Sequence, residues 1–70
     1  MNRATVESSN LASVGYDEIT KTLEIEFRSG GIYQYITVPE SVYFGLMNAD
    51  SHGEYFDSNI KKAGYPYKKM

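Results

Sequence analysis

The 70-residue sequence contains no cysteine, no tryptophan and a single histidine, His52. Without cysteine it has neither a disulfide framework nor a thiolate metal site, which excludes the disulfide-stapled class of small secreted proteins. One histidine cannot form a histidine pair, and no serine stands in the sequence context of a nucleophile elbow. We therefore expect no enzyme activity, no metal and no cofactor.

Long apolar runs are also missing. No stretch approaches the ~18 residues of a membrane span, and the N-terminal residues Met-Asn-Arg-Ala-Thr lack the apolar region of a signal peptide. These absences predict a cytoplasmic protein without a membrane partner. Seventy residues make one domain, and a hydrophobic content of 41% with seven Tyr and three Phe predicts that it is folded.

The charges are distributed unevenly along the chain. The net charge of −2 is not the basic balance of a stand-alone nucleic-acid binder. Residues 60–70 carry four lysines and no acid, a net charge of +4, whereas residues 1–59 carry three basic and nine acidic side chains, a net charge of −6. Any attraction for a polyanion is therefore local to the C-terminal end.

Three stretches have the composition and alternation of strands: residues 11–16, 22–28 and 32–38. The alternation is faultless over residues 22–28, and Gly30-Gly31 supplies the backbone freedom that a tight hairpin needs. We expect residues 1–8 and 68–70 to be loosely ordered ends of this single domain, 1–70.

The hairpin loop decides where Tyr33 and Tyr35 point. A loop with an even number of residues places both rings on the solvent face beside Glu24 and Glu26, whereas a three-residue loop turns both into the core. We favour the even loop and exposed tyrosines. The odd loop would expose three aliphatic side chains of the same strand: Ile32, Ile36 and Val38.

Two short helices follow the strands. Pro39 and Glu40 are typical of a helix start, and the first helix should run to Ala49 with Phe44 on its solvent side. Ser51 and Glu54 form a capping box for a second helix, which should end at Gly64. The residues expected to face the sheet are Val42, Tyr43, Leu46, Met47, Ala49, Phe56 and Ile60. The fold class is α+β: a three-stranded antiparallel meander followed by two helices packed on one face.

Two groups of side chains could bind nucleic acid. Exposed Tyr33 and Tyr35 could stack bases, although tyrosine is also common in strands for packing alone. The C-terminal end interleaves lysines with tyrosines, which suits a phosphate backbone, although lysines at a helix end also complement its dipole. The C-terminal candidates are Lys61, Lys62, Tyr65, Tyr67, Lys68 and Lys69. Asp50, His52 and Glu54 superficially suggest a metal site, but the helix cap already uses Glu54.

Six segments together resemble the KTSC domain family. They are Ser-Val-Gly-Tyr-Asp (13–17), Lys-Thr-Leu-Glu-Ile-Glu-Phe (21–27), Ser-Gly-Gly-Ile-Tyr-Gln-Tyr (29–35), Val-Pro-Glu (38–40), Gly-Glu-Tyr-Phe (53–56) and Tyr-Pro-Tyr (65–67). The resemblance spans residues 6–69. It implies a short bacterial domain of unknown function that occurs alone or at the C-terminus of some lysyl-tRNA synthetases. It also implies RNA binding through Tyr33 and Tyr35, and it brings no catalytic residue.

Two hypotheses of function follow. In the first, the chain is a small non-catalytic module that binds RNA, either tRNA or a single strand, through its tyrosines and its C-terminal lysines. In the second, it is a protein-interaction or self-association module that uses Phe44 and the exposed tyrosines, because aromatic side chains are enriched in interfaces.

Overall fold

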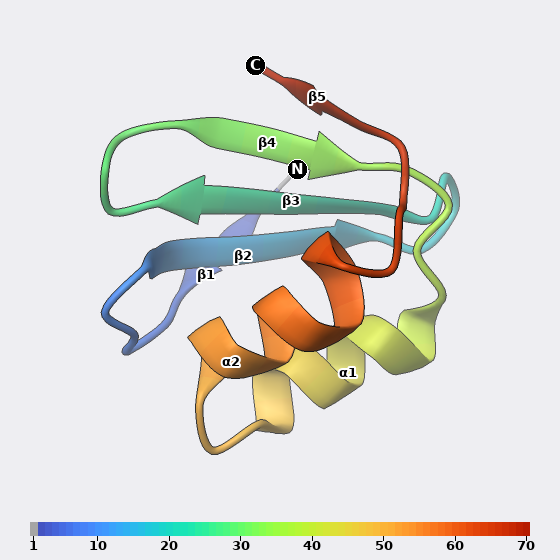
Figure 1. The fold of residues 1–70 in the computed structure, drawn as a ribbon. Helices are drawn as coiled ribbons and strands as arrows, with labels where there is room; N and C mark the ends of the chain where they lie inside the picture. Colours follow the sequence, from blue (N-terminus) through green and yellow to red (C-terminus); the bar gives the residue numbers. More distant parts are fainter. Residues whose placement is uncertain (1) are drawn as a thin grey trace.

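Over residues 2–70, the computed structural model contains a five-stranded antiparallel sheet with its helices packed on one face (Figure 1). The elements are β1 (Arg3–Thr5), β2 (Leu11–Asp17), β3 (Thr22–Phe27), β4 (Ile32–Tyr35), α1 (Glu40–Asn48), α2 (His52–Phe56), a π-helical segment η1 (Asp57–Lys61) and β5 (Tyr67–Lys69). The strands lie side by side in chain order. The α+β class with two helices on one face is confirmed, and the sheet has five strands rather than three.

Both additional strands are short and lie at the edges of the sheet. β1 and β5 have three residues each, and every side chain in them is exposed. An exposed edge strand needs no alternation of polar and apolar residues, so the pattern that identified β2, β3 and β4 was absent there. The expected lead-in thus contains an edge strand, and the C-terminal tail contains the other.

The loop between β3 and β4 has three residues, so the predicted register of β4 is wrong. Phe27 exchanges hydrogen bonds across the turn with Gly31 and Gly30, with N–O distances of 2.8 and 2.9 Å. Gly30 has a φ of +107°, the left-handed residue that a three-residue hairpin loop requires. Tyr33 then pairs with Ile25 and faces the helices, as does Tyr35.

The aliphatic exposure that argued against this register does not arise, because of Thr37. This residue has a φ of +63°, a left-handed conformation that interrupts the strand alternation after β4. In a regular strand, residues three positions apart lie on opposite faces. Because the alternation is interrupted at Thr37, Val38 and Tyr35 are both buried in the same core. Ile32 and Ile36 are half-buried rather than exposed.

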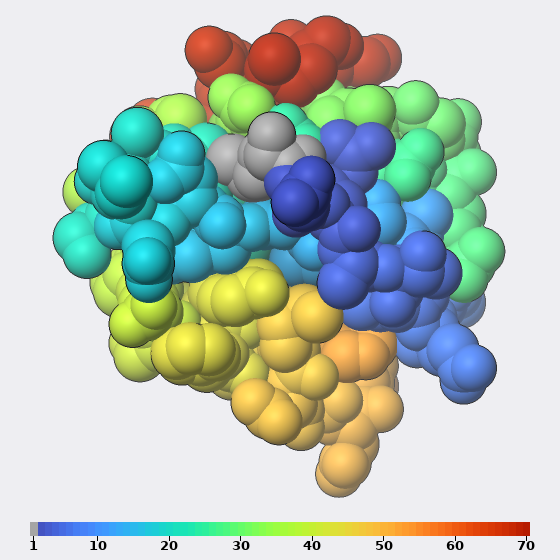
Figure 2. All heavy atoms as spheres, turned by 180° about the vertical axis from the view of Figure 1, so that it is seen from behind, coloured from blue at the N-terminus to red at the C-terminus, as the bar shows by residue number. Residues whose placement is uncertain are grey.

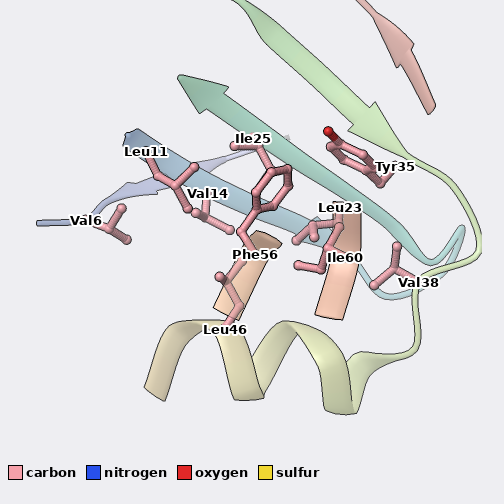
Figure 3. Close-up of a cluster of buried hydrophobic side chains, with 10 residues drawn as sticks. All are labelled: Val6, Leu11, Val14, Leu23, Ile25, Tyr35, Val38, Leu46, Phe56 and Ile60. Carbon is pink, nitrogen blue, oxygen red and sulfur yellow. The ribbon is translucent and has the colours of Figure 1, made fainter. Parts of the chain in front are cut away.

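The core lies between the sheet and the helices (Figure 3). Leu46 of α1, Phe56 of α2 and Ile60 of η1 are buried against the sheet, as their spacing predicted. Ser51 caps α2, its Oγ accepting from the backbone N–H of Glu54 at 3.2 Å. The buried hydrophobic residues are Val6, Leu11, Val14, Leu23, Ile25, Tyr35, Val38, Leu46, Phe56 and Ile60. No helix within residues 2–70 has the length and apolarity that crossing a membrane needs.

The strain at Thr37 gives a testable prediction. A β-branched residue with positive φ costs about 1–3 kcal/mol, whereas asparagine tolerates this conformation. Thr37→Asn should therefore raise the free energy of unfolding by about 1 kcal/mol in urea denaturation. Thr37→Val keeps the branching and should leave the free energy nearly unchanged. A lower unfolding midpoint for Thr37→Asn would contradict this account.

Candidate functional site

A groove of about 720 Å³ lies beside β4 and β5, between the sheet and the helical segment that follows α2. The β1–β2 loop and the β3–β4 turn close its other side. Its lining combines aromatic, basic and small polar side chains with one acid: Ser9, Asn10, Phe27, Arg28, Ser29, Tyr33, Tyr35, Phe56, Asp57, Lys61 and Tyr67. We refer to it as the aromatic groove.

Five rings form a closed circuit in this groove, in the order Tyr33, Phe27, Phe56, Tyr35 and Tyr67. Neighbouring ring centroids lie between 5.4 and 6.0 Å apart, with interplanar angles from 34° to 82°. The rings therefore meet edge to face or at a tilt, the arrangement that aromatic quadrupoles favour. Tyr35 and Phe56 are buried, so the rings that a planar ligand could contact are the half-buried Phe27 and Tyr33 and the exposed Tyr67. Tyr67 is the most open, with 63% of its surface exposed.

The reason for this gathering is the odd hairpin loop. With three residues in the turn, Tyr33 and Tyr35 share a face with Phe27, and strand β5 then places Tyr67 directly opposite Tyr35. Phe56 reaches the same rings from α2. Sequence reasoning missed Phe27 and Phe56 as site residues, although an odd loop would have put Phe27 beside the tyrosines.

Cationic side chains flank the rings. The Nζ of Lys69 lies 6.0 Å from the centroid of Tyr33, within the range of a cation–π interaction. Lys61 and Arg28 line the groove. Arg28 also fixes the β1–β2 loop, since its Nε donates to the carbonyl of Ser8, and its guanidinium has further N–H groups to offer a ligand. Sequence reasoning did not identify Arg28.

The π-helical segment η1 brings both an acid and a base to the groove. Its wide turn is closed by the Lys62 N–H donating to the carbonyl of Asp57 at 3.2 Å, and such turns occur frequently at functional sites. Asp57 and Lys61 line the groove, whereas Ile60 between them is fully buried. The core thus holds the backbone that carries these two charges.

Burial determines the protonation of the deepest phenol. It raises the pKa of Tyr35 above its ordinary value, and the neighbouring Tyr67 and Tyr33 raise it further. The hydroxyl of Tyr35 therefore stays neutral across the physiological range. A neutral phenol can donate one hydrogen bond and accept others, so it does not repel an anion.

The remaining predicted site residues lie elsewhere. Lys62 is exposed and does not line the aromatic groove. Lys68 pairs with Gln34 in the sheet, so its side chain belongs to the opposite face from Tyr67 and Lys69. Tyr65 is half-buried and packs against the core. The expected basic tail is thus divided between two faces, and only Lys61 and Lys69 accompany the rings.

The acids expected beside the tyrosines are on the far face of the sheet. Glu24 is only 7% exposed, and it accepts hydrogen bonds from Gln34 at 2.8 Å and from Arg3, with which it forms an ion pair. The hydrogen bond from Gln34, and then that from Arg3, lower the pKa of Glu24 despite its burial. Glu26 accepts from Ser13 on the same face. These carboxylates are therefore separated from the groove by the sheet itself.

The fold and the groove define the class of protein as a small α+β domain with an aromatic cleft along one end of an antiparallel sheet. The chain belongs to the KTSC domain family, whose sequence profile matches residues 7–65. The family expected from the sequence is thereby confirmed.

Other proteins are similar to this chain over all or most of its length. An uncharacterised protein of Stutzerimonas stutzeri is 43% identical over 70 residues, which cover all of this chain and 99% of that protein. The crystal structure of a KTSC domain protein from Yersinia pestis superposes with a TM-score of 0.93 at 42% identity, over 99% of this chain and 96% of that one. The lysine–tRNA ligase of Nostoc punctiforme is 46% identical over 55 residues, which cover 79% of this chain but only 10% of the ligase.

The lowered pKa of Glu24 predicts a pH-dependent contribution to stability. A carboxyl whose pKa is lower in the folded state stabilises the fold above its unfolded pKa of about 4.3, and this stabilisation disappears as the pH falls through the folded value. Glu24→Gln should therefore lower the free energy of unfolding by about 1–2 kcal/mol at pH 7, with a smaller loss near pH 3. The exposed Glu7→Gln is the control. An equal loss at both pH values would show that the charge of Glu24 is not responsible.

Proposed function

We propose that this domain is a small non-catalytic module that binds single-stranded RNA in the aromatic groove. The observation that carries the proposal is the convergence of five aromatic rings with Arg28, Lys61 and Lys69 at one cleft. Aromatic side chains stack on bases whatever their identity, while basic side chains hold the phosphates.

The distribution of charge supports RNA binding although the chain as a whole is acidic. The groove contains one acid, Asp57, whereas Glu24 and Glu26 lie on the opposite face of the sheet. A net charge of −2 over the whole chain therefore does not describe the surface that an RNA would meet. Local positive charge steers a polyanion over roughly a Debye length, about 8–10 Å.

A single-stranded segment of a tRNA fits the same proposal. The related lysine–tRNA ligase contains a similar segment that makes up 10% of its length. RNA sequence recognition concentrates on loops and ends, where bases are free to stack on side chains. A groove of about 720 Å³ suits a short single-stranded segment rather than a duplex.

Adjacent lysines give a matched test of this site. Binding of a fluorescein-labelled, mixed-sequence single-stranded RNA would be followed by anisotropy between about 50 and 200 mM salt. The affinity should fall with salt, and Lys61→Ala should weaken it and reduce the log–log slope by about 0.7. Lys62→Ala removes the same charge one residue away, outside the groove, and should have a smaller effect. A flat titration at low salt, or equal effects of both variants, would refute the site.

The stacking contribution can be tested at Tyr67. This ring is 63% exposed, so its removal should change folding little, which a thermal melt would check. Tyr67→Ala should weaken RNA binding by about 5- to 100-fold, the loss of one base–aromatic stack. Tyr67→Phe keeps the ring and should bind nearly as well as the wild type. Unchanged affinity of Tyr67→Ala would remove Tyr67 from the site.

A further inference from the structure

A second groove, of about 530 Å³, lies between the β2–β3 turn and the start of α1. We call it the turn–helix groove. Its lining includes the apolar Ile19 and Phe44, together with the acids Asp17, Glu18 and Glu40. Ile19 is 90% exposed and Phe44 is 52% exposed, so the apolar part of this surface is open to solvent.

The turn that carries Ile19 is held by its own hydrogen bonds. The Oδ1 of Asp17 accepts from the backbone N–H groups of Ile19 and Thr20, at 2.9 and 3.3 Å. This Asx-type turn fixes the backbone while the side chain of Ile19 projects outward. An isoleucine held in this way loses little backbone freedom on contact with a partner, which favours association.

The floor of the groove is equally well fixed. Tyr16 and Tyr43 stack with centroids 4.9 Å apart and planes within 9° of parallel, and the Tyr16 hydroxyl donates to the Val38 carbonyl at 2.6 Å. Burial raises the pKa of Tyr16, and Glu40, Glu18 and Asp17 raise it further. The three carboxylates thus impose a negative potential on this floor.

The C-terminal segment around β5 carries the opposite charge. Tyr67 and Met70 are 63% and 62% exposed, and Lys68 and Lys69 lie between them. Within residues 2–70, the large hydrophobic side chains that are exposed are Ile19, Phe44, Tyr67 and Met70. They therefore fall in two places: Ile19 and Phe44 in the turn–helix groove, which is lined by acids, and Tyr67 and Met70 in the C-terminal segment, which carries two lysines.

We propose that the turn–helix groove of one copy of this chain receives residues 67–70 of a second copy. Side chains alternate along residues 67–70, so each face of this segment carries one apolar side chain and one lysine: Tyr67 with Lys69, and Met70 with Lys68. On either face the apolar side chain can cover Ile19 and Phe44 while the lysine approaches the acids of the groove. The chain is complementary to itself in both apolar surface and charge. Because the two surfaces are different, the contact is head-to-tail. One copy keeps its β5 free and the other keeps its groove free, so the pair retains one free surface of each kind.

The two surfaces are placed so that both can be used at once. Figure 2 shows the β2–β3 turn, in cyan, directly above the first half of α1, in yellow-green and yellow, while the C-terminal segment forms a red ridge along the top of the molecule. The contact is small, so the association is weak and transient. Part of it is electrostatic and is screened by salt.

This proposal stands independently of RNA binding. Tyr67 and Lys69 also belong to the aromatic groove, so a ligand there competes with self-association for β5. The turn–helix groove has no residue in common with the aromatic groove. Variants of the turn–helix groove therefore test self-association without altering the RNA site.

Sedimentation velocity with two complementary variants provides the test. The groove variant is Glu18→Gln with Ile19→Ser, and the β5 variant is Lys68→Ser with Lys69→Ser. Each should weaken self-association at least about tenfold relative to the wild type at low salt. Mixed together, they should form a 1:1 dimer, because the groove variant keeps β5 intact and the β5 variant keeps the groove intact. Glu7→Gln and Lys62→Ser remove charges outside both surfaces and should behave as the wild type.

The outcomes are decisive in both directions. A dimer in the mixture with monomers in each separate solution supports the contact, since only the mixture brings an intact groove together with an intact β5. A wild-type monomer at every concentration up to about 1 mM would overturn it. So would undiminished association of either variant, or a mixture that stays monomeric while circular dichroism shows both variants folded.

Discussion

The three-residue turn between β3 and β4 is the constraint on which the rest of the sheet depends. Gly30, with a φ of +107°, fixes the number of residues in this turn, and that number fixes the face of every residue in β4. One residue more would place Tyr33 and Tyr35 among the carboxylates of the far face. The core, the aromatic groove and the separation of that groove from Glu24 all follow from this turn.

Elements with a strong internal pattern could be predicted from the sequence. The alternation that predicted residues 22–28 as a strand gave β3, and the spacing of Leu46, Phe56 and Ile60 gave the buried faces of the helices. The edge strands β1 and β5 could not be predicted, because they bury no side chain of their own. Their pairing is decided by the backbone of their neighbours, which leaves no trace in local composition.

The prediction of the β4 register was wrong for a different physical reason. The prediction treated Val38 as a continuation of the β4 alternation, so burying the tyrosines seemed to expose three aliphatic residues. The positive φ of Thr37 interrupts this alternation instead, and a single residue with positive φ cannot be inferred from the hydrophobic pattern around it. The candidate site was affected in the same way. The tyrosines, Lys61 and Lys69 were identified, but Phe56 and Arg28 join them only through tertiary contacts.

The place of β5 in the sheet has a consequence for the order of folding. Every other pair of neighbouring strands is joined by a short turn or loop, whereas β4 and β5 are separated by both helices and η1. Closing a longer loop costs more conformational entropy, so we expect β5 to dock after the rest of the sheet has formed. Its amides should then exchange with solvent through local opening, before those of β3. The aromatic groove is thus completed by the strand that we expect to dock last, and a ligand that bridges Tyr33 and Tyr67 would stabilise that strand directly.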